Sequence, residues 1–122
     1  MIIIVRRSLK PLLLLILMVA MVRVCWAHAI LMDSTPKPNA VVKGPNLDID
    51  LRYNVRVDGS RSRVYLVTAD GTETKLVLAP QSAPEILQTR ATGLKPGKYK
   101  LEWDALASDG HMSRGEVPFT VD

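Results

Sequence analysis

Alternation between apolar and polar residues is the feature of this sequence that most restricts its fold. In residues 47–53, LDIDLRY, the apolar and aromatic side chains stand at every second position, with charged residues between them. Residues 99–105, YKLEWDA, repeat the pattern, and residues 117–121, VPFTV, continue it near the end of the chain. A period of two places successive side chains on opposite faces of a strand, one of them buried. No segment after residue 28 shows helical periodicity over three turns, so the sequence predicts an all-β domain.

Turn-forming residues divide the predicted strands at short intervals. Asp-Gly pairs stand at 58–59, 70–71 and 109–110, and Lys-Pro-Gly stands at 95–97. These residues tolerate a positive φ or preset a turn, and residues 68–74, TADGTET, are typical of a hairpin. Seven short strands in a small domain favour an immunoglobulin-like Greek-key β-sandwich. The predicted strands are 28–33, 46–53, 62–69, 72–79, 85–91, 98–106 and 115–121.

The start of the chain has the pattern of a secretory signal peptide. A basic segment at 6–10, RRSLK, precedes an uninterrupted apolar run of eleven residues from Leu12 to Val22. This run is shorter than the ~20 apolar residues that a transmembrane helix needs. A small-x-small cleavage motif follows at 25–27. We therefore expect residues 1–27 to be removed by cleavage just before His28, with an uncleaved amino-terminal anchor as the alternative.

Cleavage would change the composition of the part that folds, residues 28–122. The full chain has 16 Lys and Arg and 12 Asp and Glu. Four of the basic residues and none of the acidic ones lie in the predicted signal, so the net charge of residues 28–122 is near zero. A domain without excess positive charge is not favoured as a nucleic-acid-binding protein. The single cysteine is also removed, so neither a disulfide nor a thiolate ligand remains. One compact domain must then be held by its apolar core, in which we place Trp103.

Only two histidines remain after cleavage, and the topology of a sandwich brings them to one end. His28 begins the domain, and His111 follows Asp109 and Gly110 in the loop between the sixth and seventh predicted strands. If successive strands alternate in direction, the amino terminus lies at the same end as the loops after the second, fourth and sixth strands. Such loops cluster in immunoglobulin-like sandwiches. We therefore expect His28, Asp109 and His111 to lie close together.

A histidine at the first position of a processed chain has two nitrogen donors, its free α-amine and its imidazole. Both can bind one metal ion and close a chelate ring, and the amine, with a pKa of about 7.7–8.0, exists only after cleavage. The imidazole of His111 and the carboxylate of Asp109 would complete a set of three nitrogens and one oxygen. A tetragonal set of this kind suits Cu(II), which also leads the divalent affinity order. Zinc can use the same ligands but gains nothing from near-planar geometry.

Two motifs resemble the CopC-like family of periplasmic copper-resistance proteins. Residues 28–42, HAILMDSTPKPNAVV, are similar to the mature start of these proteins, which open with a histidine, a short strand and a turn to proline. Residues 108–121, SDGHMSRGEVPFTV, resemble their D-G-H loop and final strand. The middle strands and the Leu-x-Pro-Gly-x-Tyr turn at 94–99 are similar as well. The resemblance covers essentially all of residues 28–122.

The resemblance implies one Cu(II) per chain, bound by the amine and ring of His28, by Asp109 and by His111. It implies a non-enzymatic, monomeric copper carrier or buffer of the periplasm, acting in copper homeostasis or resistance, often beside an inner-membrane copper transport protein. Some members of the family have a second, Cu(I) site in a methionine-rich loop. Only Met32 and Met112 follow residue 28, and thioethers are the soft ligands that Cu(I) prefers. We therefore expect no such second site.

Two other functions remain open. A small copper-dependent oxidative enzyme would use the same kind of amino-terminal histidine chelate. Such enzymes are usually larger and need a flat face with exposed aromatic residues, and an anionic Asp109 ligand disfavours reduction to Cu(I). A metal-free adhesion or assembly module would leave both histidines without a role. Metal titration separates the module from the other two, and reductant-dependent turnover of polysaccharide separates the enzyme from the carrier.

Overall fold

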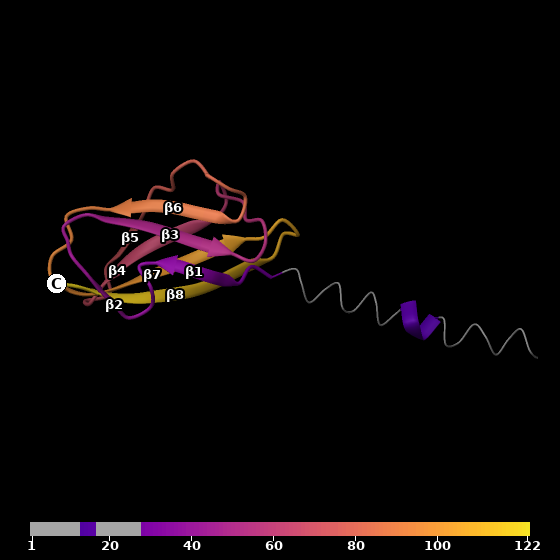
Figure 1. The fold of residues 1–122 in the computed structure, drawn as a ribbon, viewed down its shortest axis with the longest axis horizontal. Helices are drawn as coiled ribbons and strands as arrows, with labels where there is room; N and C mark the ends of the chain where they lie inside the picture. Colours follow the sequence, from indigo (N-terminus) through magenta and orange to yellow (C-terminus); the bar gives the residue numbers. More distant parts are fainter. Residues whose placement is uncertain (1–12, 17–27) are drawn as a thin grey trace, which may run out of the picture.

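Two β-sheets packed face to face contain all the strands of the described residues (Figure 1). The computed structural model describes residues 13–16 and 28–122. Most of the predicted signal peptide lies outside these residues, so its cleavage stays a prediction. The described part contains no helix that is long and apolar enough to cross a membrane. The strands are β1 (Leu31–Thr35), β2 (Ala40–Val42), β3 (Leu47–Tyr53), β4 (Arg63–Thr68), β5 (Glu73–Lys75), β6 (Ile86–Ala91), β7 (Gly97–Leu106) and β8 (Met112–Val121).

The strand order is that of an immunoglobulin-like Greek key. One sheet has the order β1-β3-β6 and the other the order β2-β8-β7-β4-β5. All neighbouring strands are antiparallel except β2, which runs parallel to β8. The first segment of the domain therefore serves both sheets, because β1 pairs with β3 and β2 pairs with β8. The predicted fold class is confirmed.

The strand count and some strand bounds differ from the prediction of seven strands, since the described residues form eight. The additional strand, β2, has three residues, too few for alternation to be visible in the sequence, and it pairs only with residues 119–121. The first strand begins at Leu31 rather than at residue 28. The last begins at Met112 rather than at residue 115, because the β7–β8 ladder continues to the Leu106–Met112 pair.

The predicted strand at 72–79 is wrong over most of its length, because the chain changes sheets there. Only Glu73–Lys75 pairs with β4. The backbone N–H of Leu76 still donates to the carbonyl of Val64 in β4, at 2.9 Å, but that of Ala79 donates to Gln88 in β6, at 2.8 Å. An apolar run that crosses between two sheets keeps the composition of a strand without a continuous partner. Composition alone therefore predicted it as a single strand.

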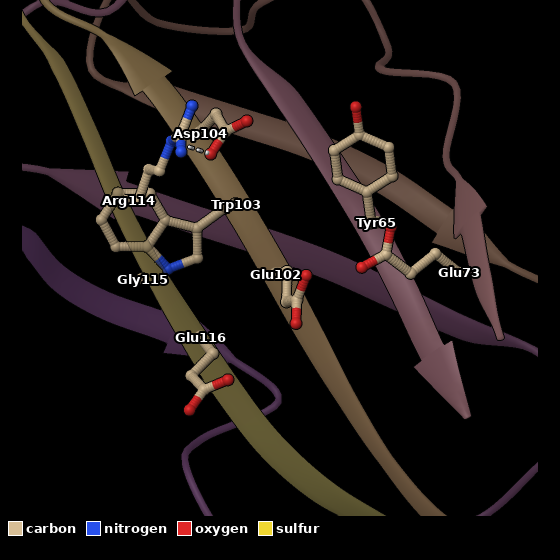
Figure 2. A pocket seen from close by; sticks show the side chains of 8 residues that line it. All are labelled: Tyr65, Glu73, Glu102, Trp103, Asp104, Arg114, Gly115 and Glu116. Atoms are coloured by element: carbon tan, nitrogen blue, oxygen red, sulfur yellow. Dashed lines mark ion pairs between the residues drawn. The ribbon is translucent and has the colours of Figure 1, made fainter. Parts of the chain in front are cut away.

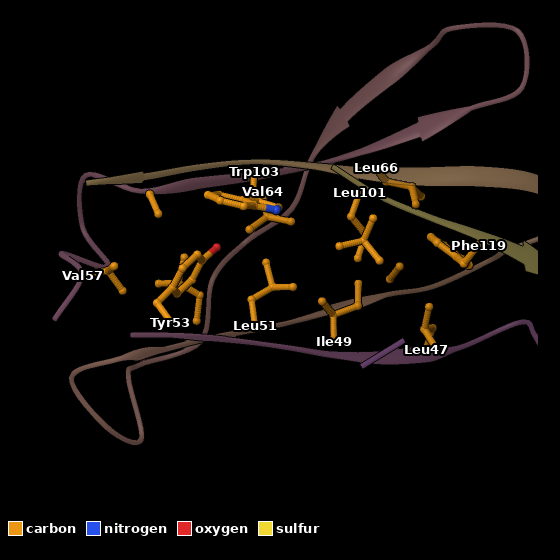
Figure 3. Packing of buried hydrophobic residues seen from close by; sticks show 14 of the residues in the cluster. Leu47, Ile49, Leu51, Tyr53, Val57, Val64, Leu66, Leu101, Trp103 and Phe119 are labelled. Atoms are coloured by element: carbon orange, nitrogen blue, oxygen red, sulfur yellow. The ribbon is translucent and has the colours of Figure 1, made fainter. Parts of the chain in front are cut away.

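The alternation in the sequence corresponds to alternation in burial. In β3 the residues Leu47, Ile49, Leu51 and Tyr53 are buried, and Asp48 and Arg52 between them are exposed. Leu101 and Trp103 of β7 face them from the other sheet (Figure 3), and Ala105 of β7 is buried as well. Burying one large apolar side chain contributes about 1.5–3 kcal/mol, so many such residues hold the two sheets together. Trp103 is a core residue, as predicted, with 6% of its surface exposed.

The indole of Trp103 occupies space that a side chain at position 115 would need. Gly115 lies opposite Trp103 on β8, and a Cβ atom at this glycine would stand 2.8 Å from Cε2 of the indole. Tyr53 packs against the indole from the other sheet, with ring centroids 5.1 Å apart and planes at 72°. The close approach of the indole to the β8 backbone therefore requires glycine at position 115.

We predict that Gly115→Ala lowers the free energy of unfolding by about 1–3 kcal/mol, the usual cost of overpacking a core. Denaturant unfolding monitored by circular dichroism measures this change. Trp103→Phe removes the fused ring that the new methyl group would meet, so it provides the matched background. The alanine substitution should cost less in Trp103→Phe than in the wild type. An equal cost in both backgrounds would show that the indole is not the obstacle.

Candidate metal centre

The two histidines lie together at the end of the sandwich where the described domain begins. Figure 1 shows the start of β1 and the β7–β8 loop at this same end, with the carboxyl terminus at the other. The ring centroids of His28 and His111 are 5.3 Å apart, with the planes at 64°. The expected juxtaposition of these residues is therefore observed, and their role as metal ligands stays a prediction.

The segment that carries His28 is fixed by its neighbours on the chain. Ala29 is buried, with 4% of its surface exposed. The backbone N–H of Ile30 donates to the Oδ1 atom of Asn54 at 2.7 Å, and the N–H of Asn54 donates to the carbonyl of Ile30 at 3.1 Å. This reciprocal pair of hydrogen bonds, the Ile30–Asn54 clamp, holds the backbone two residues from His28. His28 itself remains exposed.

His111 is positioned by the tight hairpin between β7 and β8. The N–H of Gly110 donates to the carbonyl of Ala107 at 3.0 Å, and the N–H of Ala107 donates to the carbonyl of His111 at 2.9 Å. Gly110 has a φ of 89°, the left-handed conformation that glycine adopts without steric cost. A turn followed by a left-handed glycine is a common geometry for a short hairpin loop. The Asp-Gly-His spacing therefore places His111 where the strand resumes.

Asp109 holds the ring of His111 in one orientation. Its Oδ1 atom accepts the backbone N–H of His111 at 3.1 Å, and its Oδ2 atom lies 2.7 Å from Nδ1 of the ring. These two bonds, the backbone one first, lower the pKa of the Asp109 carboxyl below its usual range. An ionised carboxylate favours the tautomer with the proton on Nδ1, which leaves the lone pair on Nε2. Carboxylates orient metal-binding histidines in this way in many proteins.

We predict that neutral His111 carries its proton on Nδ1 in the metal-free domain, because Asp109 accepts a hydrogen bond there. Long-range ¹H–¹⁵N correlation spectra above the imidazole pKa distinguish the two tautomers. In Asp109→Ala the tautomer with the proton on Nε2 should become the major one, as in free histidine. His28 serves as the internal control and should not change. A wild-type His111 that is protonated mainly on Nε2 would exclude this role for Asp109.

The side chains by themselves do not complete a metal site. Within residues 13–16 and 28–122, no group of three or more His, Cys, Asp or Glu side chains is arranged to hold a metal ion. The carboxylate of Asp109 is engaged by His111, and the α-nitrogen of His28 is a peptide nitrogen in the unprocessed chain. Cleavage before His28 would add the missing donor as an amine. The full set of three nitrogens and one oxygen that suits copper would therefore exist only after cleavage before His28.

Another hollow lies on the outer face of the five-stranded sheet and is lined by acidic residues, but most of these form ion pairs with basic residues and do not indicate a metal-binding site. Glu102 and Glu116 lie there on neighbouring strands beside Tyr65 (Figure 2). Lys100 bridges both glutamates, with its Nζ 3.2 Å from an oxygen of each, and these partners raise the pKa of the lysine. Arg114 pairs with Asp104 at 3.1 Å. Glu102, Glu116 and Asp104 therefore each have a basic partner on the same face, as on a solvated sheet face.

Sequence reasoning missed the loop from Asn54 to Asp58, which contacts both halves of the candidate centre. Asn54 forms the Ile30–Asn54 clamp, and Val57 forms a bridge with Ala107 at the base of the β7–β8 hairpin. A single asparagine after a strand is the only signal in the sequence. It is typical of any turn, so it did not indicate a structural role beside the histidines.

Comparison with known proteins identifies the family. Residues 31–122 match the CopC domain, so this chain belongs to the CopC family, as the sequence motifs predicted. Proteins of this family are copper-binding carriers and not enzymes. The family therefore supports a copper-related function and a non-enzymatic one.

Three individual proteins illustrate the relationship. The protein YobA of Escherichia coli (strain K12) is 29% identical over 99 residues, which cover 79% of this chain and 80% of YobA. The copper transport protein CutJ of Bacillus subtilis (strain 168) is 25% identical over 111 residues, covering 88% of this chain but 20% of CutJ. The crystal structure of CopC from Methylosinus trichosporium OB3b superposes with a TM-score of 0.70 at 28% identity, covering 78% of this chain and 94% of that one.

Proposed function

We propose that residues 28–122, once processed, form a periplasmic carrier or buffer for Cu(II) that acts in copper homeostasis or resistance. The observation that carries this proposal is the distance of 5.3 Å between the ring centroids of His28 and His111. The two rings lie at the end of the sandwich where cleavage would release an α-amine. Membership of the CopC family supports copper as the metal. One such centre per domain gives one Cu(II) per chain, and no second copy of the chain is needed to complete it.

The proposed ligands are the α-amine and imidazole of His28, Nε2 of His111 and a carboxylate oxygen of Asp109. The amine and ring of His28 close a chelate on the metal, which favours binding because the two donors are already held together. To bind the metal, the carboxylate of Asp109 would have to leave Nδ1 of the His111 ring, because the two nitrogens of an imidazole point in nearly opposite directions and the metal would lie at Nε2. Three nitrogens and one anionic oxygen suit the tetragonal preference of Cu(II).

The exposure of the centre favours exchange of the metal over its permanent retention. The side chain of His111 is 60% exposed and that of Asp109 is 31% exposed, so an incoming ligand can reach a bound ion without unfolding the domain. CutJ, a copper transport protein, is matched by this chain over only a fifth of its length. A segment similar to this chain thus occurs within a larger copper transport protein, which supports an inner-membrane copper transport protein as the partner.

A second copper site for Cu(I) is not part of this proposal. Met32 lies on β1 in the three-stranded sheet, and Met112 begins β8 in the five-stranded sheet. They are the only methionines after residue 28. Two thioethers on different sheets do not form the methionine-rich loop that a Cu(I) site of that kind needs.

The decisive test is to block the α-amine of His28 chemically. We predict that Nα-acetylation of the domain that starts at His28 raises the Kd for Cu(II) by well over tenfold. The loss of one good ligand commonly costs more binding free energy than the ~1.4 kcal/mol that corresponds to a tenfold change in Kd. Competition with a chromogenic chelator measures this change. A domain with one extra residue before His28 is not an adequate control. The amine of the added residue and the peptide nitrogen of His28 would chelate copper together with the His28 ring.

The pH dependence of binding provides the matching control. Copper must displace the proton of the free amine, so affinity in the unmodified domain should weaken as the pH falls below about 7.7–8.0. The acetylated domain should lack this component of the pH profile. Equal affinity and equal pH dependence in both forms would mean that the amine is not a ligand, and the reason for preferring copper over zinc would be lost.

A further inference from the structure

A groove with a free volume of about 530 Å³ adjoins the candidate metal centre. Its walls come from the loop around Arg56 and Asp58, from the loop around Gln81 and Ser82, and from Ser108. Ser108 directly precedes Asp109 in the β7–β8 hairpin. The groove therefore begins one residue from the proposed copper ligand set.

The loop that carries Arg56 is tied to both histidine segments. At one end, Asn54 forms the Ile30–Asn54 clamp next to His28. At the other end, Val57 bridges to Ala107, and the N–H of Asp58 donates to the carbonyl of Leu106 at 2.8 Å. Arg56 lies between these attachments, so its backbone is held beside the metal centre from both sides.

Arg56 is the cation in this groove whose charge is not compensated. Its side chain is exposed and forms no ion pair with any residue in the described part of the chain. Asp58, in contrast, accepts hydrogen bonds from the N–H and hydroxyl of Ser60, at 3.0 and 2.6 Å, and lies 3.8 Å from Arg61. Asp58 also lines the groove, but its carboxylate is engaged by Ser60 and Arg61 and forms no ion pair with Arg56, so the positive charge of Arg56 remains available to an anion.

The opposite wall of the groove is joined to the Arg56 loop by hydrogen bonds of Gln81. The Nε2 atom of Gln81 donates to the carbonyl of Val57 at 3.0 Å, and its Oε1 atom accepts the N–H of Gly59 at 3.2 Å. These bonds join the two loops that line the groove. The exposed hydroxyls of Ser82 and Ser108 add neutral donors to the guanidinium. A planar guanidinium and hydroxyl donors that line the same groove are suited to bind a carboxylate.

We infer that this groove binds a carboxylate group of the small polycarboxylate chelate in which Cu(II) reaches the protein. The inference rests on the proposed Cu(II) site. In the exchange, three nitrogen donors and the Asp109 carboxylate form bonds to copper while each bond from copper to the incoming chelate breaks, and the chelate leaves with its electron pairs. The His28 ammonium group loses one proton to solvent, and the oxidation state of copper does not change. Arg56 attracts the anionic chelate and holds the leaving carboxylate beside the metal centre.

The test compares two sources of copper by stopped-flow absorbance on the domain that starts at His28. With copper(II) citrate, an anion, Arg56→Gln should lower the uptake rate constant about three- to tenfold at low ionic strength, because one attractive charge is lost. With hydrated Cu²⁺, a cation, the same substitution should not slow uptake. The difference should shrink as added salt screens the charge.

Arg90→Gln is the matched control, because it removes the same charge at the other end of the sandwich. Arg90 lies opposite Asp48 near the start of β3 and pairs with it at 3.7 Å. This variant should take up copper from both sources at the wild-type rate. Both arginines are exposed, so thermal unfolding should confirm that neither substitution disturbs the fold.

Three outcomes would overturn the inference. If Arg90→Gln slows uptake from citrate as much as Arg56→Gln does, overall charge and not the groove is responsible. If the wild type binds Cu(II) but Arg56→Gln takes it up from citrate at the wild-type rate, the groove fails and the proposed copper function stands. If the wild type takes up copper from neither source, the proposed function and the inference fail together.

Discussion

The pairing of β7 with β8 determines where the candidate centre stands and what lies beneath it. Ten residues of each strand pair in register, from Gly97 opposite Val121 to Leu106 opposite Met112. The same register places Trp103 in the core over Gly115. It also closes the β7–β8 hairpin so that His111 directly precedes the first residue of β8. A slip by one residue would exchange the buried and exposed faces of a strand, so core packing and the position of His111 depend on one alignment.

The candidate centre combines a part that folding supplies with a part that processing would supply. Folding places the two rings 5.3 Å apart and fixes the His111 ring through Asp109. The strongest proposed donor, the α-amine of His28, requires proteolysis. In the proposed function, the unprocessed chain would therefore lack the full affinity for copper, which ties binding to export. The exposure of the histidines and the adjoining Arg56 groove favour a site that exchanges its metal.

Much of the fold was predictable because it depends on local pattern. Alternation in residues 47–53 indicated a strand with one buried face, and the Asp-Gly turn at 109–110 indicated a hairpin. Strand parity then placed both histidines at one end, as observed. The sequence did not predict β2 or the sheet crossing after Lys75, because those segments are defined by partners that are distant in sequence. Tertiary pairing, and not propensity, determines them.

The details of the site were harder to predict than its location. Asp109 was expected beside the histidines, but its two hydrogen bonds to His111 depend on the exact turn geometry. The Ile30–Asn54 clamp and the position of Arg56 depend on a loop whose residues have no distinctive pattern. Residue types therefore indicated which donors can bind a metal, and only the structure shows how neighbouring groups orient those donors.

The most direct test of the central proposal is electron paramagnetic resonance of Cu(II) bound to the domain that starts at His28. Nitrogen superhyperfine couplings report how many nitrogens lie in the equatorial plane of the metal. The amine of His28 and the rings of His28 and His111 predict couplings to three equatorial nitrogens from one copper ion per chain. Couplings to two nitrogens or fewer would contradict a centre built from both histidines and the new amino terminus.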